Sequence, residues 1–173
     1  MATWLNSDGL NIKLGITEAT SQNTSYFPGG EYRSVGPNRV SEVVIDLTKL
    51  PAFGTTGILN DVEFFGAGWV PEMVEVETIV AATGATATLS IGLRRNSDRT
   101  TDISTTALVN AVTVASIAAV GTRLTITAGS TGAGANIGVA TTFDALLSAT
   151  VGTANFATGK VKVRVFWRPS VNI

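Results

Sequence analysis

The stretch KVKVRVFWRPS, residues 160–170, decides the fold because its side chains alternate with a period of two. That period is typical of a β-strand with one buried face. The side chains predicted to face a core are those of Val161, Val163, Val165 and Trp167. Those predicted to face outward are Lys160, Lys162, Arg164 and Phe166. Burial of three valines and a tryptophan stabilises such a strand by about 1.5–3 kcal/mol per side chain.

Other segments alternate in the same way, and turn-forming residues separate them. The predicted inward positions are Val43, Ile45 and Leu47, then Val74, Val76, Thr78 and Val80, then Leu89, Ile91 and Leu93. Shorter strands are expected within residues 122–129 and 141–152. Pro71 lacks an amide donor, so the strand after it should begin near residue 72 or lie at a sheet edge. The Ala-rich residues 105–121 favour one or two short helical turns that end at Gly121.

Six to eight short strands between Gly-rich turns predict an all-β fold, an antiparallel β-sandwich of the jelly-roll kind. The distribution of charged residues along the sequence also predicts which two strands pair. Residues 50–93 hold five acids and no Lys or Arg, whereas residues 145–173 hold four bases and no acid. Opposite charges on adjacent antiparallel strands stabilise the pair by tenths of a kcal/mol each. We therefore expect the strand at 72–80 to lie beside the strand at 160–167.

Residues 1–40 show no sustained apolar period, and turn formers interrupt them throughout. This segment is predicted to be an extended N-terminal arm, followed by a β-sandwich domain at residues 41–173. An arm of this kind cannot bury enough surface to order itself, so it should lie on its own domain or on a neighbour. Its aromatic residues are the expected contacts. They are Trp4, Tyr26, Phe27 and Tyr32.

The composition excludes most enzyme classes. The 173 residues include no cysteine and no histidine, which removes His-based triads, thiolate nucleophiles and the common zinc sites. Twelve basic and thirteen acidic residues give a net charge of −1, so no attraction to nucleic acid or to an anionic membrane is expected. The start lacks a signal-peptide pattern, and the longest weakly polar stretch, 107–120, is too short to span a membrane. We expect a soluble, unprocessed protein without a cofactor.

The stretch GLRRNSDRTTDIST, residues 92–105, gathers three arginines and two aspartates. Asp98 and Asp102 could form an acid/base pair or a cation site, but the spacing lacks the run of oxygen ligands of a calcium loop. A solvated turn that starts at Ser97 or Asp98 is the favoured interpretation. The arginines would then contact a partner chain. Two Gly-rich stretches, 81–88 and 129–138, lack the ending and the context of a phosphate loop.

Several stretches resemble the small virion structural proteins of tailed bacteriophages that decorate or cement the capsid. They are NSDGLNIKLGITEA (6–19), GGEYRSVGPNRVSEVVIDLTKLP (29–51), MVEVETIVAATGATATLSIGL (73–93), DRTTDIS (98–104) and GKVKVRVFWRPS (159–170). The resemblance implies a jelly-roll domain with an N-terminal arm, made in the bacterial cytoplasm and carried on the outer capsid surface, often as a homotrimer. It implies that the partners are the major capsid protein and copies of the chain itself. Residues 29–37 would be an anchoring or subunit-bridging segment.

Pattern and resemblance together predict a non-enzymatic capsid decoration protein. The expected partner contacts are Trp4, Tyr26, Phe27, Tyr32, Arg33, Arg94, Arg95 and Arg99. Two alternatives stay open. One is another virion part, such as a head fibre or tail component that contacts the host. The other is a carbohydrate-binding β-sandwich in which exposed Trp69, Trp4 or Phe166 would stack on sugar rings.

Overall fold

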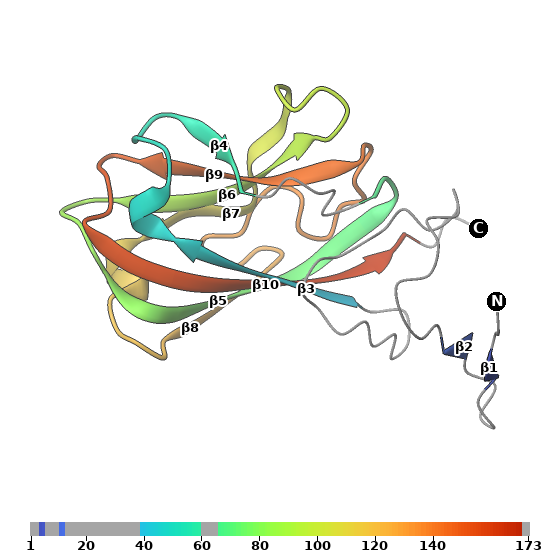
Figure 1. Cartoon of the computed structure of the whole chain (residues 1–173), viewed down its shortest axis with the longest axis horizontal. Coiled ribbons are helices and arrows are strands. Elements are labelled where there is room, and N and C mark those ends of the chain that lie inside the picture. The colour runs from blue at the N-terminus through green and yellow to red at the C-terminus, as the bar shows by residue number, and fades with distance from the viewer. Residues whose placement is uncertain (1–3, 6–10, 13–38, 60–65, 171–173) are drawn as a thin grey trace.

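A computed structural model describes residues 4–5, 11–12, 39–59 and 66–170, and most of them form two four-stranded antiparallel sheets packed face to face (Figure 1). The β10 sheet has the order β3 (Arg39–Asp46), β10 (Thr158–Pro169), β5 (Trp69–Thr83) and β8 (Arg123–Thr127). The β9 sheet has the order β4 (Thr56–Ile58), β9 (Ala145–Gly152), β6 (Thr88–Arg95) and β7 (Asp102–Thr113). Two 3₁₀ turns complete the sandwich, η1 (Leu47–Lys49) and η2 (Val114–Ile117). The short strands β1 (Trp4–Leu5) and β2 (Asn11–Ile12) pair with each other.

The order of pairing identifies the sandwich as a jelly roll. The eight strands pair as nested hairpins, β3 with β10, β4 with β9, β5 with β8, and β6 with β7. This long double ribbon then folds over, because β10 also pairs with β5 and β9 also pairs with β6. Two Greek keys arranged in this way define the jelly roll. The predicted fold class is therefore confirmed, and so is the predicted pairing of the strand at 72–80 with the strand at 160–167.

The core lies between the sheets and follows the alternation in the sequence. The four predicted inward side chains of β10 are buried, and so are Leu89, Ile91 and Leu93 of β6. Trp167 keeps its polar atom satisfied, since its Nε1–H donates to Ser41 Oγ at 2.9 Å. A buried indole generally needs such a partner. The core therefore includes the C-terminal strand along most of its length.

Two expectations for β5 are wrong. The strand begins at Trp69, and Pro71 lies inside it. Proline is tolerated there because β8 pairs with β5 only from Met73 onward, and the β10 register shifts next to Pro71. A second register shift, near Lys160, turns Val80 outward together with Ile79, so Val80 is 44% exposed instead of facing the core.

The Ala-rich residues 105–121 are mostly strand. β7 continues to Thr113, and the helical part is the single turn η2, at 114–117. Pairing with β6 outweighs the helix preference of alanine here. The Gly-rich loop lies along the outer edge of β7, where Asn110 N donates to Gly132 O at 2.9 Å. Gly134 approaches so closely that a Cβ would lie 2.3 Å from the carbonyl carbon of Ala107. The loop thus covers an edge that could otherwise pair with another chain.

Candidate interaction surface

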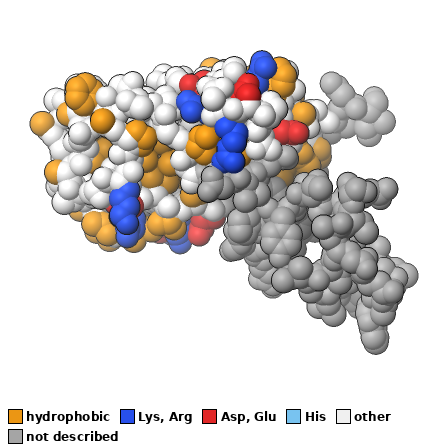
Figure 2. All heavy atoms as spheres, turned by 45° about the horizontal axis from the view of Figure 1, so that its top comes forward, with side chains coloured by type: hydrophobic (Ala, Val, Ile, Leu, Met, Phe, Trp, Pro, Cys, Tyr) orange, Lys and Arg blue, Asp and Glu red, His pale blue; other side chains and the backbone are white. Residues whose placement is uncertain are grey.

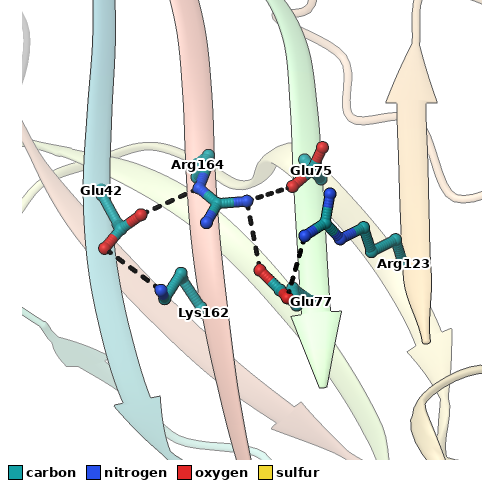
Figure 3. A network of polar contacts seen from close by, with 6 residues as sticks. All are labelled: Glu42, Glu75, Glu77, Arg123, Lys162 and Arg164. Carbon is teal, nitrogen blue, oxygen red and sulfur yellow. Dashed lines mark hydrogen bonds and ion pairs between the residues drawn. The ribbon is translucent and has the colours of Figure 1, made fainter. Parts of the chain in front are cut away.

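The outer face of the β10 sheet carries an ionic ladder across all four strands (Figure 3). Arg164 of β10 lies at its centre. Its Nε donates to Glu42 of β3 at 2.8 Å, and its Nη1 contacts both Glu75 and Glu77 of β5, the latter at 3.1 Å. Arg123 of β8 reaches Glu77 at 3.2 Å from its Nη2. The ladder therefore links strands that are distant in the sequence.

The ladder neutralises itself. Lys162 lies 3.6 Å from Glu42, and two further pairs, Lys160 with Asp46 and Arg168 with Glu72, flank it at 3.8 and 2.6 Å. The hydrogen bond to Glu42 raises the pKa of Arg164 above its usual value. Burial acts to raise the pKa of Glu77, but the hydrogen bond and charge of Arg123, with the nearby cations of β10, leave that pKa below its usual value. Charges that are paired in this way stabilise a sheet face.

The stretch 92–105, where β6 ends and β7 begins, has two acids, and both have partners within the chain. Arg94 holds Asp102 with two hydrogen bonds, Nε to Oδ1 at 2.7 Å and Nη2 to Oδ2 at 3.1 Å. This hydrogen bonding raises the pKa of Arg94. The Asp98 carboxylate accepts from the amides of Thr100 and Thr101, both at 2.9 Å, and these bonds lower its pKa to about 2. The prediction that Asp98 binds nearby amides in a turn is confirmed.

Arg95 has a different environment from Arg94. Its guanidinium lies over the ring of Phe143, with 3.7 Å between Cζ and the ring centroid. Its Nε is buried and has no hydrogen-bond acceptor. Arg99 is exposed in the loop and has a φ of 58°. The structure thus separates the three predicted arginines: Arg94 is bound to an acid, Arg95 is stacked on an aromatic ring, and Arg99 is on the surface.

Backbone contacts hold the surroundings of Arg95 in place. The loop closes on itself, since Arg95 N donates to Thr101 O at 2.9 Å. Asn96 N donates to Asp144 O at 2.8 Å, and the Asp144 carboxylate accepts from Ala67 N at the same distance. Asp144 therefore joins the loops before β5, after β6 and before β9. We define the Arg95–Phe143 pair, with the loop at residues 96–101, as the candidate interaction surface.

Sequence reasoning missed Phe143 and Asp144. Both lie just before β9, in a stretch without any motif. The only signal was a single aromatic residue beside an acid at the start of a strand, and nothing in the sequence joined them to the loop after β6. In the view of Figure 2, most of the surface is uncharged and the charged side chains gather in a few places.

The predicted arm contacts lie largely outside the described residues. This holds for Tyr26, Phe27, Tyr32 and Arg33. For Trp4 only the backbone is described, where it pairs with Ile12 in the β1–β2 ribbon. Their role as partner contacts stays a prediction.

Two of the three aromatic residues named for the carbohydrate-binding alternative are described, and both are partly buried. Trp69 packs edge to face on Trp167 with ring centroids 4.2 Å apart and is only partly exposed, so it is not a flat platform for a sugar. Phe166 is partly buried as well. Within the described ranges, no group of three acids is placed to hold a metal ion. Nor does any helix in these ranges have the length and apolarity to cross a membrane.

Comparison with known proteins finds solved structures that are similar to this chain in fold. No family model and no curated protein matches the sequence. A chain from the capsid of Ralstonia phage GP4 is 16% identical, with a TM-score of 0.53, over 86% of this chain and 94% of that chain. Chains from the acidic stable capsid of Helicobacter pylori bacteriophage KHP30 and from the capsid asymmetric unit of cyanophage Pam1 are 18% and 20% identical, with TM-scores of 0.45 and 0.47. They cover 78% and 90% of this chain, and 90% and 99% of their own lengths. The chain therefore shares its jelly-roll fold with a protein of a phage capsid.

Proposed function

We propose that this chain is a non-enzymatic structural protein of a bacteriophage virion, which binds the outer surface of an icosahedral capsid and stabilises it. The observation that carries the proposal is the match to the GP4 capsid chain over 86% of this chain and 94% of that one. The two chains are thus of similar length. A single small jelly roll of this size suits a protein that is added to a shell.

The surface of the described residues suits a protein that binds other proteins and does not catalyse a reaction. Its acids and bases are mostly paired with each other, and no nucleophile has a neighbouring histidine, since the chain has none. Stabilisation would arise by mass action, because each copy binds the assembled shell and not the disassembled chains. A symmetric shell repeats such a contact many times.

In this proposal, the arm attaches the domain to the shell or to neighbouring copies, and three copies associate at each position. The arm was predicted at residues 1–40, and we take it to end at residue 38 because β3 begins at Arg39. A trimer places three arms close together. Their combined attachment would exceed the affinity of one arm through effective concentration.

Copy number tests the proposal. We expect quantitative mass spectrometry of purified particles to find this protein in a fixed, high ratio to the most abundant capsid protein. A few copies per particle would instead assign it to a tail, a fibre or a unique vertex. If it is itself the most abundant capsid protein, it builds the shell, and the proposal of an added protein is wrong.

Removal of the arm tests the attachment. A variant that lacks residues 1–38 retains β3, whose Val40 pairs with Phe166 of β10, so we expect it to fold. It should fail to bind shells stripped of the native protein, whereas the full chain should rebind and restore their resistance to heat. Binding of the truncated variant with unchanged affinity would contradict the role of the arm. Stripped shells that are as heat-resistant as complete ones would contradict the stabilising function.

A further inference from the structure

We propose that Arg95, held against Phe143, is an anchor that binds a carboxylate on a different protein chain of the particle. This inference rests on the proposed function and adds the chemistry of one contact to it. The anchor is distinct from the ionic ladder, which lies on the outer face of the β10 sheet. It is also distinct from the predicted contacts of the arm.

The guanidinium of Arg95 forms no ion pair with an acid of the described residues, although its charge contributes to the lowered pKa of Asp98. Among the described residues, no carboxylate pairs with it, whereas Arg94 beside it holds Asp102 in two hydrogen bonds. Its Nε is buried without an acceptor, which costs about 1–3 kcal/mol in typical cases. An unsatisfied buried donor in a native structure calls for an explanation. Neither an ion pair nor a hydrogen bond of Nε within the described residues accounts for an arginine at this position, and a partner that binds the rest of the guanidinium would.

The side chain is fixed before any partner arrives. Stacking on Phe143, with 3.7 Å from Cζ to the ring centroid, restrains a side chain that would otherwise be flexible. Phe143 is 40% exposed, so the stacked pair lies at the surface. Asp144, next to Phe143, fastens the loops on both sides through Asn96 N and Ala67 N. A preorganised arginine loses little entropy on binding, and arginines of this kind are enriched among the residues that dominate interfaces.

A carboxylate is the expected ligand. A planar guanidinium can hold a carboxylate or a phosphate through two parallel hydrogen bonds. Binding of nucleic acid draws on several cations that act together. Here the neighbouring Arg94 is neutralised by Asp102, and the whole chain has a net charge of −1. A single cation without an ion-pair partner among the described residues, beside an exposed aromatic ring, fits an acidic side chain on a protein surface.

The carboxylate should come from a different protein and not from a second copy of this chain. The described part of the chain has eight acids, and all of them are already engaged. Those that bind cations are Glu42, Glu72, Glu75, Glu77 and Asp102. Those that accept from hydroxyl or amide groups are Asp46, Asp98 and Asp144. The described part of a second copy would have to break one of these contacts to supply the ligand.

Rebinding to stripped particles tests the inference with the full-length protein. The variant Arg95→Gln removes the charge, and Phe143→Leu removes the ring but keeps the charge. Lys49→Gln, at an exposed cation of η1, is the control for the loss of one positive charge. Each variant is first compared with the wild type by circular dichroism and thermal unfolding. Bound protein is then measured by co-sedimentation over a range of concentrations, at low and high salt.

We expect Arg95→Gln to weaken binding about tenfold or more, Phe143→Leu about threefold to tenfold, and the control less than twofold. The loss caused by Arg95→Gln should be smaller at high salt, because salt screens the ion pair in the wild type. Binding of folded Arg95→Gln with wild-type affinity would overturn the inference and leave the proposed function intact. Failure of the wild-type protein to bind would overturn the proposed function itself. A lower oligomeric state of purified Arg95→Gln in sedimentation velocity would overturn the choice of a different protein, because the ligand would then belong to a second copy.

Discussion

Replacement of Arg164 by methionine should destabilise the sandwich by about 0.6–3 kcal/mol at neutral pH. The arginine side chain is 23% exposed and contacts three carboxylates, those of Glu42, Glu75 and Glu77. Surface ion pairs contribute about 0.2–1 kcal/mol each, and three such contacts give the estimate. Methionine retains most of the apolar stem, so the change removes charge more than packing. It also leaves three acids close together without their central cation.

The dependence on pH separates charge from packing. Since the pKa of Glu77 is lowered in the folded protein, its ion pairs stabilise the fold above the unfolded value near 4.5. This stabilisation is lost as the pH falls through the lower, folded pKa. Urea unfolding should therefore show the full difference between Arg164→Met and wild type at pH 7 and a much smaller one at pH 3. The accompanying shift in Tm at pH 7 should be about 2–4 °C per kcal/mol.

The control for this experiment is Arg123→Met. Arg123 is 58% exposed and contacts only Glu77 in the ladder, so its loss should cost less than about 1 kcal/mol. Equal destabilisation by Arg164→Met at pH 7 and pH 3 would refute the electrostatic reasoning. So would equal effects of the two substitutions at pH 7.

Three further substitutions test local features. Gly92→Ala would place a Cβ 2.4 Å from a backbone oxygen of β7, so we expect a loss of about 1–3 kcal/mol or more in chemical unfolding. Gly129→Ala, where a Cβ meets nothing within 4 Å, should cost only the strain of its positive φ and serves as the control. Trp167→Phe removes the donor to Ser41 and part of a buried ring, so it should destabilise by about 1–3 kcal/mol without change of fold, as seen by circular dichroism. NMR of the amides of Thr100 and Thr101, which donate to Asp98, should show a titration midpoint at about pH 2. Since the pKa of Asp98 is lowered in the folded protein, these hydrogen bonds stabilise the loop at neutral pH, and this stabilisation is lost as the pH falls through that midpoint. A midpoint near 3.8 would contradict the hydrogen bonding.

The strands and their inward faces could be predicted because alternate side chains of a β-strand point to opposite faces of the sheet, so a period of two in the sequence shows which residues are buried. The alternation from Val161 to Trp167 maps directly onto burial in β10. The pairing of β5 with β10 could also be predicted, because opposite charges in the two segments indicated a contact. The other two strands of the ladder, β3 with Glu42 and β8 with Arg123, were missed. Glu42 alternates outward in β3, so its position was a usable signal, but its segment mixes both signs of charge.

Features that depend on local irregularity could not be predicted. The shift that turns Val80 outward comes from an extra residue in β5 relative to β10, and no pattern in either strand reveals it. The helix preference of the Ala-rich residues was overridden by pairing along β6 and by the Gly-rich loop along the edge of β7. Propensity describes a segment alone, whereas sheet edges are decided by what lies beside them.

The contacts of single side chains at the candidate interaction surface could not be predicted from the sequence either. Composition identified a cluster of arginines, and the register of β6 with β7 gives Arg94 its acid, since Arg94 lies opposite Asp102. The environment of Arg95 is set by Phe143, whose ring stacks on its guanidinium. Phe143 lies close to Arg95 because β9 pairs with β6 and begins at Ala145, opposite Arg95. Neighbours in the sequence thus have different roles because successive strand residues face opposite sides.

The charged side chains of the described residues fall into two groups: those that form ion pairs within the chain, and those that do not. The ladder residues are paired across strands, and this pairing favours one strand order and one register over others, since a shift by one residue would separate Arg164 from its acids. Such charges specify the fold. Arg95 forms no ion pair within the described residues and leaves a buried donor without an acceptor, while its stacking on Phe143 holds it in place. A cation that is held rigidly at the surface in this way is better explained by a partner than by the fold alone. A loss of binding in Arg95→Gln that exceeds the small loss of stability expected from the lost stacking would distinguish the two roles.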